Sequence, residues 1–403
     1  MQRPAALTDP DLLNMPRDLT ERERQVLTLR AAGEPVAAIA ALLVVEPRTV
    51  KFHLRNVYAK LDLATAPRAA RQLALARYAA AAPTVMPVPG RPRPPVRRFL
   101  FRPDRTLTQV LAHEQFTFSA EVIPPRNGAE QAAVLAQVAR LIDAGARFLA
   151  VTKGAGGSLR GGSLPIALAI KEQFDVPCVA HFTCRDLLPE EVENQLVDHQ
   201  YFGIRNILAL RGDPPDGQPG WRSRRGAYDH AYQLIEQIRD LNRGVYLPRA
   251  GGPPPATHAP ADFCIGAAVY PEHLDAAEGT TFFKRKVDAG AEYAITQMVF
   301  DTDAYGRFLD RCEKARLSVP VLPGTRILRS RARARRTAEK YGVSVPAAML
   351  RALPQIDDPA ADARALDVFL GVVERLRRLG APGVHLFVTD VDTACTALAA
   401  LKQ

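Results

Sequence analysis

From residue 109 onward, the sequence alternates short apolar runs with stretches of helical periodicity, such as 131–144 and 282–289. Eight apolar runs can be counted, and they predict strands at 117–123, 146–152, 178–184, 206–211, 264–270, 293–299, 319–323 and 384–389. Because apolar strands that alternate with helices form right-handed βαβ units, the pattern predicts a parallel sheet. Eight units favour a closed (β/α)8 TIM barrel, and an open doubly wound sheet is the alternative.

A proline-rich stretch separates this region from the first part of the chain. Residues 79–99 read AAAAPTVMPVPGRPRPPVRRF. Proline at this density prevents a helix and favours an extended spacer. The sequence therefore predicts a small all-α domain at 1–78, a Pro/Arg-rich linker at 79–108 and the barrel at 109–403.

The first domain has the pattern of several short helices. Thr20 and Glu23 form a capping box that begins one helix, and Gly33 ends it. A second helix is predicted at 36–43, and a third begins at Pro47. Two short helices joined by a tight turn are typical of proteins that place the second helix in the major groove of DNA.

Residues 19–63, LTERERQVLTLRAAGEPVAAIAALLVVEPRTVKFHLRNVYAKLDL, resemble the LuxR-type helix-turn-helix family. The shared motifs are the L-T-x-R-E-R-x-V-L opening, I-A-x-x-L and the T-V-K-x-H-x-x-N-V-x-x-K-L core, and the resemblance extends over about residues 19–75. It implies DNA binding, with contacts from Thr49, Lys51, His53 and Lys60.

The chain departs from the LuxR-type pattern at two places. Glu34-Pro35 and the following alanines stand where the family usually has a polar run, and Val45-Glu46 replaces a commoner Ser. These changes remove groups that contact phosphates. A helical bundle used for oligomerisation is therefore the alternative to DNA binding.

Charge and composition limit the partners and the compartment. The formal net charge of +10 favours polyanionic partners or phosphorylated ligands. No apolar run approaches the roughly 18 to 20 residues that span a bilayer, and the N-terminus lacks the order of a signal peptide. We therefore expect a soluble, cytoplasmic protein without a membrane partner. The five cysteines are scattered without a C-x-x-C pair, and we predict no metal site.

Polar residues occupy the C-terminal ends of six of the eight predicted strands. In a barrel these ends form one rim, where the active sites of this fold are built. The residues are Glu121, Thr152, Lys153, His181, Thr183, Arg211, Asp213, Tyr270 and Gln297. A carboxylate, an imidazole, a phenol, an amide and an Arg-Asp pair on one rim predict a functional site.

Two further features favour a phosphorylated ligand. The segment VTKGAGGSLRGG after the second strand is suited to present backbone N–H groups near Gly154, Gly156 and Gly157, although its spacing is not that of a dinucleotide-binding glycine motif. Arg285 and Lys286 offer charge-assisted donors to a pyrophosphate. An ordinary glycine-rich turn and a solvated basic surface are the alternatives.

Residues from about 115 to 403 resemble the methylenetetrahydrofolate reductase family. The motifs, in the family's order, are EVIPPR (121–126), VTKGAGGS (151–158), HFTC (181–184), GIRNILALRGDPP (203–215), VYPEH (269–273), KRKVDAGAEYAITQMVFD (284–301), VPVLPG (319–324) and GVHLF (383–387). The resemblance implies a flavin-containing barrel that moves hydride from NADH or NADPH to FAD and then to 5,10-methylenetetrahydrofolate. The product is 5-methyltetrahydrofolate, which places the chain in one-carbon metabolism and methionine biosynthesis.

The family's residue roles transfer to matching positions. Glu121 is the implied general acid that helps open the methylene bridge, and Gln297 binds the pterin. Asp213 lies near the pyrimidine edge of the flavin, where a carboxylate favours passing the hydride on. The implied FAD-binding residues are Thr152, His181, Arg211, Gly212, Asp213, Tyr270, Arg285 and Lys286. We also expect a homo-oligomer.

Several positions depart from the reductase pattern. Val122 and Ile123 replace two aromatics, Lys153 replaces a Tyr, and Thr337 stands where the family has a stacking Phe. Three hypotheses follow: a working reductase with a fused DNA-binding module, a transcription regulator whose barrel senses folate or flavin without turnover, or an enzyme whose N-terminal helices serve assembly.

Overall fold

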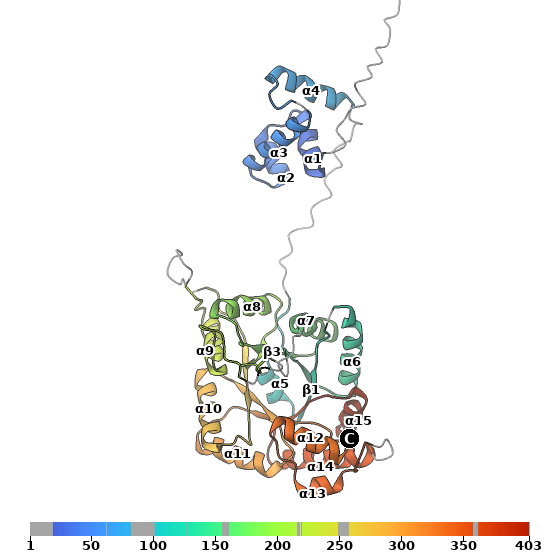
Figure 1. Cartoon of the computed structure of the whole chain (residues 1–403), viewed down its shortest axis with the longest axis vertical. Helices are drawn as coiled ribbons and strands as arrows, with labels where there is room; N and C mark the ends of the chain where they lie inside the picture. Colours follow the sequence, from blue (N-terminus) through green and yellow to red (C-terminus); the bar gives the residue numbers. More distant parts are fainter. Residues whose placement is uncertain are drawn as a thin grey trace, which may run out of the picture. The chain divides into compact units, whose positions relative to one another are not determined.

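The computed structural model describes residues 19–61, 63–81, 101–126, 128–154, 161–215, 218, 220–248, 258–357 and 362–402. The chain divides into two compact units, residues 1–97 and 98–403, each with its own hydrophobic core (Figure 1).

The described part of the N-terminal unit is helical. Its helices are α1 (Glu21–Ala31), α2 (Val36–Leu43), α3 (Pro47–Lys60) and α4 (Arg68–Ala81). The predicted capping box is confirmed, because the Thr20 hydroxyl accepts a hydrogen bond from the Glu23 N–H and the Glu23 carboxylate accepts one from the Thr20 N–H. Val26, Ile39 and Val50, one from each of the first three helices, are fully buried together. The predicted helix-turn-helix arrangement is therefore present.

The C-terminal unit is a closed barrel of parallel strands, in which each strand pairs with its neighbours in the sequence and β1 pairs with β8. The strands are β1 (Thr117–Val122), β2 (Phe148–Val151), β3 (Cys178–Thr183), β4 (Asn206–Leu210), β5 (Cys264–Val269), β6 (Tyr293–Met298), β7 (Val321–Thr325) and β8 (Gly383–Leu386). All eight lie within or overlap the predicted runs. The prediction of a (β/α)8 barrel is confirmed, and ring closure excludes the open doubly wound sheet.

Helices surround the barrel (Figure 1). They are α6 (Gln131–Ala144), α7 (Ser163–Phe174), α8 (Pro189–Tyr201), α9 (Ala231–Asn242), α10 (Ala276–Ala289), α11 (Thr302–Lys314), α14 (Asp362–Arg378) and α15 (Val391–Leu401), and a short 3-10 turn, η2 (Gly128–Glu130), precedes α6. Among the described residues, no helix is both long enough and apolar enough to cross a membrane.

The two faces of each strand differ in what they contact. On β1, Phe118, Ala120 and Val122 join the core between strands and helices, so Ser119 and Glu121 face the barrel interior. The interior is filled from the same alternation on the other strands by a second apolar cluster, which includes Phe148, Val179, Leu208, Tyr293, Ile295 and Leu322. Polar residues at inward positions near the C-terminal ends of the strands therefore lie beyond this apolar cluster, at the C-terminal opening of the barrel, which we call the mouth.

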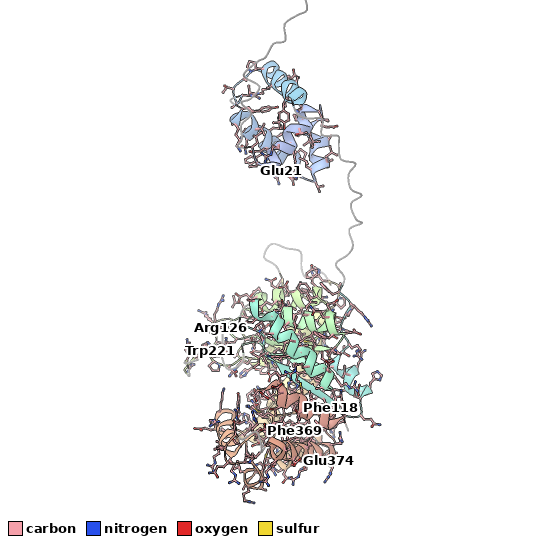
Figure 2. All side chains as sticks on the ribbon, turned by 90° about the vertical axis from the view of Figure 1, so that its right-hand side faces the viewer. Glu21, Phe118, Arg126, Trp221, Phe369 and Glu374 are labelled. Atoms are coloured by element: carbon pink, nitrogen blue, oxygen red, sulfur yellow. The ribbon has the colours of Figure 1, made fainter. Side chains whose placement is uncertain are left out.

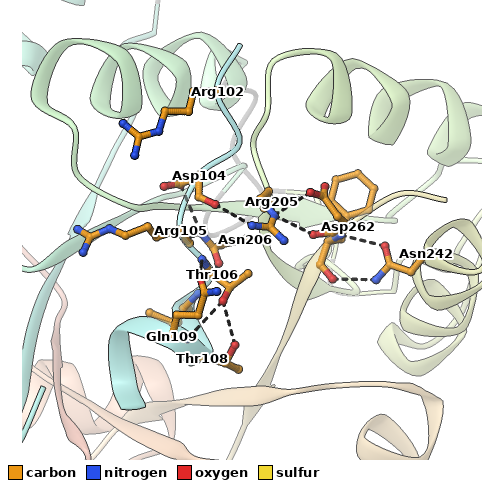
Figure 3. Close-up of polar contacts among 12 residues, drawn as sticks. Arg102, Asp104, Arg105, Thr106, Thr108, Gln109, Arg205, Asn206, Asn242 and Asp262 are labelled. Carbon is orange, nitrogen blue, oxygen red and sulfur yellow. Dashed lines mark hydrogen bonds and ion pairs between the residues drawn. The ribbon is translucent and has the colours of Figure 1, made fainter. Parts of the chain in front are cut away.

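Helix α5 (Leu107–His113) closes the opposite, N-terminal end of the barrel, because Leu107 and Val110 belong to the interior cluster. The segment before it is held by Asp104, whose carboxylate accepts hydrogen bonds from the Cys178 N–H at 2.8 Å and from the Asn206 side-chain amide at 3.3 Å (Figure 3). Asn206 in turn accepts from the Leu107 N–H at 2.6 Å. Residues 101–108 therefore pack with the barrel unit, which begins before the predicted boundary at 109.

An extension between β7 and α14 contains α12 (Arg331–Tyr341) and α13 (Ala347–Ala352). It has its own apolar cluster, in which Leu328, Ala334 and Leu353 pack with Met298 and Phe300 from the end of β6 and the loop that follows. The Arg331 guanidinium also donates to the Leu353 carbonyl oxygen at 3.0 Å. These contacts hold the extension at the C-terminal end of the barrel.

Candidate active site

Glu121 lies on the interior face of β1, one residue before the end of the strand. Its side chain is half-buried, and burial raises the pKa of its carboxyl group to about 7. The physical cause is lost hydration of the charged form inside the barrel. A carboxyl group with this pKa can hold a proton at neutral pH and donate it, which is the chemistry of a general acid.

Two histidines face the barrel interior from β3 and β8, two strands that are separated in the ring by β1 and β2. Nε2 of His181, on β3, is buried and has no hydrogen-bond partner in the part of the chain that the structure describes. Nδ1 of His385, on β8, lies 2.9 Å from the Ser119 hydroxyl. Burial lowers the pKa of His181 to about 4 and that of His385 to about 3, so both rings are neutral at pH 7. A neutral His181 therefore offers an unpaired ring nitrogen to a ligand.

The turn Arg211-Gly212-Asp213 directly follows β4. Gly212 has φ of 95°, and a Cβ there would lie 2.9 Å from the Cβ of Arg185 and 3.3 Å from that of Thr183. The Arg185 guanidinium also donates to the Asp213 carbonyl oxygen. The fold therefore requires this glycine whether or not a ligand approaches it, and the side chains of Arg211 and Asp213 stay exposed at the mouth.

Tyr270 follows β5 and is 51% exposed. Partial burial raises the pKa of its phenol, and the nearby Asp213 carboxylate raises it further. Tyr270, after β5, therefore lies close to Asp213, after β4. The Lys286 ammonium lies 5.9 Å from the centre of the Tyr270 ring and donates to the Ala268 carbonyl oxygen at 2.7 Å. Burial lowers the pKa of Lys286 to about 8.

Arg285, the neighbour of Lys286 on α10, points elsewhere. Its guanidinium lies 5.8 Å from the centre of the Tyr232 ring on α9 and 5.7 Å from that of Phe282. Consecutive residues of a helix are separated by about 100°. The structure therefore does not bring the two basic residues together at Tyr270.

The segment after β2 contains Thr152, which is buried and donates its N–H to the Val122 carbonyl oxygen at 3.0 Å. The Lys153 ammonium points to α8, where it donates to the Gln195 side chain at 2.7 Å. It also lies 4.5 Å from the centre of the Phe182 ring, and burial lowers its pKa to about 8. Gly154 has a positive φ of 61°, and Gly156 and Gly157 lie outside the described residues.

Gln297 lies on β6 beside a register irregularity in its pairing with β7. Its side-chain oxygen accepts a hydrogen bond from the Met298 N–H at 2.9 Å. The carboxamide NH2 group is the part of this side chain that can still turn to a ligand.

The C-terminal rim thus gathers Glu121, His181, Asp213, Tyr270 and Lys286, whereas Lys153 and Arg285 turn toward the surrounding helices. Figure 2 shows Arg126 and Trp221, which follow β1 and β4, toward the same side of the barrel unit. No group of three or more His, Cys, Asp or Glu residues that could hold a metal ion occurs among the described residues.

His385 was not among the residues predicted from the sequence, which came from the other strands of the barrel. The signal was available, since His385 stands at an inward position in the alternating run VHLF. Its ring stacks on Phe148, with the two ring centres 6.3 Å apart.

In the N-terminal unit, Lys51 on the polar side of α3 is exposed to solvent, and Thr49 and His53 are partly exposed. Lys60 is different, because its ammonium donates to the buried Glu23 carboxylate at 2.7 Å. This hydrogen bond holds the pKa of Glu23 at about 2. Lys60 therefore ties α3 to α1.

Comparison with known proteins finds a matching family for each of the two units. Residues 106–401 match the family described as methylenetetrahydrofolate reductase. The chain belongs to this family. Residues 17–73 match the bacterial regulatory proteins of the luxR family, in agreement with the predicted architecture.

Individual relatives differ in length. The 5,10-methylenetetrahydrofolate reductase of Escherichia coli is 31% identical over 294 residues, which cover 70% of this chain and 90% of that protein. Methylenetetrahydrofolate reductase (NADH) 1 of Arabidopsis thaliana is 29% identical and is matched over 72% of this chain and 49% of its own length. The chain thus spans about half the length of the plant relatives. A solved structure of an uncharacterized Clostridium thermocellum protein that binds 5-methyl-5,6,7,8-tetrahydrofolic acid covers 73% of this chain and 98% of its own, at a TM-score of 0.48 and 14% identity.

Proposed function

We propose that the barrel is a flavin-dependent reductase that converts 5,10-methylenetetrahydrofolate to 5-methyltetrahydrofolate, with NADH or NADPH as electron donor. The observation that supports this most is Glu121, a half-buried carboxyl group with a pKa near 7 on the inner face of β1, at the mouth of a barrel of this family. Methylene-bridge opening needs a proton at neutral pH, and a carboxyl group with an ordinary pKa is almost fully ionised there.

The residues at the mouth fit a flavin. Nε2 of His181 is buried and has no hydrogen-bond partner among the described residues. A ligand that forms a hydrogen bond with this nitrogen would remove the cost of burying it unpaired. Arg211 and Lys286 supply positive charge for phosphates, and the half-exposed Tyr270 offers an aromatic face. FAD, when bound there, supplies the ability to accept hydride from the nicotinamide and to give it to the folate.

The chain's own residues then have distinct tasks. Glu121 holds and donates the proton that opens the methylene bridge, because burial favours its protonated form. Asp213 would stabilise the cationic folate that results, and its carboxylate would disfavour negative charge on a bound flavin. Gln297 orients the pterin through its free NH2 group. Since the nicotinamide donor and the folate use the same face of the barrel, they bind one after the other, in a ping-pong cycle.

Flavin binding by His181 can be tested on the full chain. FAD is titrated into purified protein and followed by flavin absorbance and fluorescence, and His181→Ala is compared with His113→Ala, a change at an exposed site on α5 at the other end of the barrel. We expect His181→Ala to weaken FAD binding and His113→Ala to leave it unchanged. Equal affinities of all three proteins would remove His181 from the flavin site.

A second function, folate or flavin sensing without turnover, is favoured by one observation. Thr337, at the position of the family's stacking Phe, is only 5% exposed on α12 and offers no aromatic surface to a nicotinamide or folate. Product formation separates the two functions. A flavin-loaded protein that binds folate but forms no 5-methyltetrahydrofolate from NADH or NADPH, as followed by mass spectrometry, would favour the sensor.

For the N-terminal unit we propose DNA binding through α3, with contacts from Thr49, Lys51 and His53. The support is the luxR-family match together with the exposure of Lys51 on the polar side of α3. Duplex affinity should fall steeply with salt and fall further in Lys51→Ala. Arg24→Ala, which changes an exposed charge on α1, is the control. Affinity that is insensitive to salt and to Lys51 would favour the assembly role instead.

A further inference from the structure

A pocket of about 120 Å³ lies at the C-terminal ends of β7 and β8, on the same rim as Glu121. Its lining includes Arg326, Arg329, Arg333, Phe387, Asp390 and Thr393. Three guanidinium groups from one short segment thus meet at a single cavity. The pocket has more space than one water needs, so a small anionic group fits in it.

Arg326 directly follows β7 and is half-buried. Its Nε is buried and has no hydrogen-bond partner in the described part of the chain, and no described acidic side chain forms an ion pair with it. Burial lowers the pKa of its guanidinium, and the neighbouring charge of Arg333 lowers it further. A buried N–H donor without an acceptor is unfavourable, and an oxyanion in the pocket would supply the acceptor.

The other two arginines are held in place by acids that do not line the pocket. Arg329 forms a bidentate ion pair with Asp362, in which Nε and Nη2 donate to the two carboxylate oxygens at 2.9 and 2.8 Å. Arg333 forms an ion pair with Asp357. These pairs fix the directions of both guanidinium groups and neutralise most of their charge. Arg326 is therefore the cation whose charge is left for a ligand.

The opposite wall is the start of α15. Asp390 caps this helix by accepting hydrogen bonds from the N–H and the hydroxyl of Thr393, which hold the pKa of its carboxyl group low. Phe387 packs against β7, where Gly324 leaves room for its ring, since a Cβ on Gly324 would lie 2.4 Å from the ring. The cationic wall therefore stands opposite a helix start that is already capped by Asp390, and TIM barrels often bind phosphate in this region.

The pocket also lies close to the proposed active site. Gly324 on β7 is paired in register with His385, and His385 is paired with Ser119, two residues before Glu121. A substrate that reaches Glu121 can therefore place a charged end near Arg326.

We infer that the pocket, through Arg326, binds a phosphate or carboxylate group at one end of a substrate of the barrel and selects substrates that contain it. The inference rests on the proposed reductase function for its choice of substrates. Two sources have this chemistry: the 2′-phosphate that distinguishes NADPH from NADH, and the carboxylates of the folate's glutamate tail.

The first test needs no turnover and no flavin. Binding of inorganic phosphate to the full chain is measured by phosphorus NMR line broadening at constant ionic strength. Arg326→Gln is compared with Arg335→Gln, a matched change at an exposed position of α12. We expect Arg326→Gln to weaken binding by about tenfold or more, the effect of losing hydrogen bonds from a charged donor, and Arg335→Gln to have no effect. Because Arg326 has no described partner to lose, the variant should melt no lower than the wild type, and Arg326→Lys should bind with intermediate affinity.

The second test identifies the source. Dissociation constants are compared for NADPH against NADH, and for folates with one against several glutamates. Loss of NADPH discrimination in Arg326→Gln would assign the pocket to the 2′-phosphate, and loss of glutamate discrimination would assign it to the folate tail. Phosphate binding that is unchanged in Arg326→Gln, or no change in either discrimination, would overturn the inference. If Arg326-dependent phosphate binding persists in a protein that binds neither flavin nor folate, the proposed function fails while the anion site stands.

Discussion

Glu121→Gln tests whether the barrel mouth raises the pKa of this carboxyl group, independently of any substrate. The ordinary pKa of 4.5 rises to about 7 in the folded protein. The folded state therefore keeps a proton that the unfolded chain releases between these values. The protonated form's contribution to stability is fully present below about pH 4.5 and is lost as pH rises through about 7. The two values differ by an amount that corresponds to about 3 kcal/mol of destabilisation at alkaline pH.

The substitution removes the ionisation and with it the penalty. Integrated between about pH 5.5 and about pH 8.5, the gain in stability of Glu121→Gln over the wild type should grow by about 2 kcal/mol. Urea unfolding of the flavin-free chain, followed by far-UV circular dichroism at both pH values, measures this difference. Glu339→Gln, on the exposed side of α12, is the control and should show no such growth. A gain that is the same at both pH values would refute the argument that burial controls this carboxyl group.

Three further outcomes follow from the structure. Lys60→Ala removes the partner that holds the pKa of Glu23 at about 2, so the N-terminal unit should lose about 1–3 kcal/mol of unfolding free energy at pH 7. This loss should become smaller as pH falls from about 4.5 toward 2. Melting curves that do not depend on pH in this way would contradict the assignment. Gly212→Ala places a Cβ at a positive-φ position, 2.9 Å from the Cβ of Arg185, and should lower the unfolding free energy by about 1–3 kcal/mol. Gly128→Ala, whose Cβ would have nothing within 4 Å, is the control and should not lower it. Equal thermal shifts of the two variants would show that the turn adapts. Asp104→Ala leaves the buried Cys178 N–H without its acceptor and removes one of the two acceptors of the Asn206 amide, so amide exchange in α5 should quicken. Unchanged protection would mean that α5 is held by its apolar contacts alone.

The barrel could be predicted from sequence because its strands are covered on both faces. Such strands appear as continuous apolar runs, and the closed parallel topology brings their ends to one rim without any knowledge of side-chain contacts. The first three helices were equally accessible, since the capping box at Thr20 and the proline at Pro47 are local signals.

Features that depend on tertiary contacts were not visible in the sequence. Lys60 matches the helix-turn-helix pattern as a residue that contacts DNA, but only the packing of α3 on α1 brings it to Glu23. Gly212 was predicted to be an FAD-binding residue, and the structure adds that the side chains of Thr183 and Arg185 already require a glycine there. Arg326 was not among the predicted site residues, because its pocket forms only where the ends of β7 and β8 meet α12 and the start of α15.

The central claim, that Glu121 supplies the proton in folate reduction by this barrel, is tested most directly by anaerobic half-reactions of the flavin-loaded chain. NADH or NADPH should bleach the flavin absorbance of both the wild type and Glu121→Gln. Methylenetetrahydrofolate should then restore it rapidly in the wild type and not in the variant. Reoxidation of Glu121→Gln by the folate at the wild-type rate, or a wild-type chain that binds no flavin at all, would contradict the account.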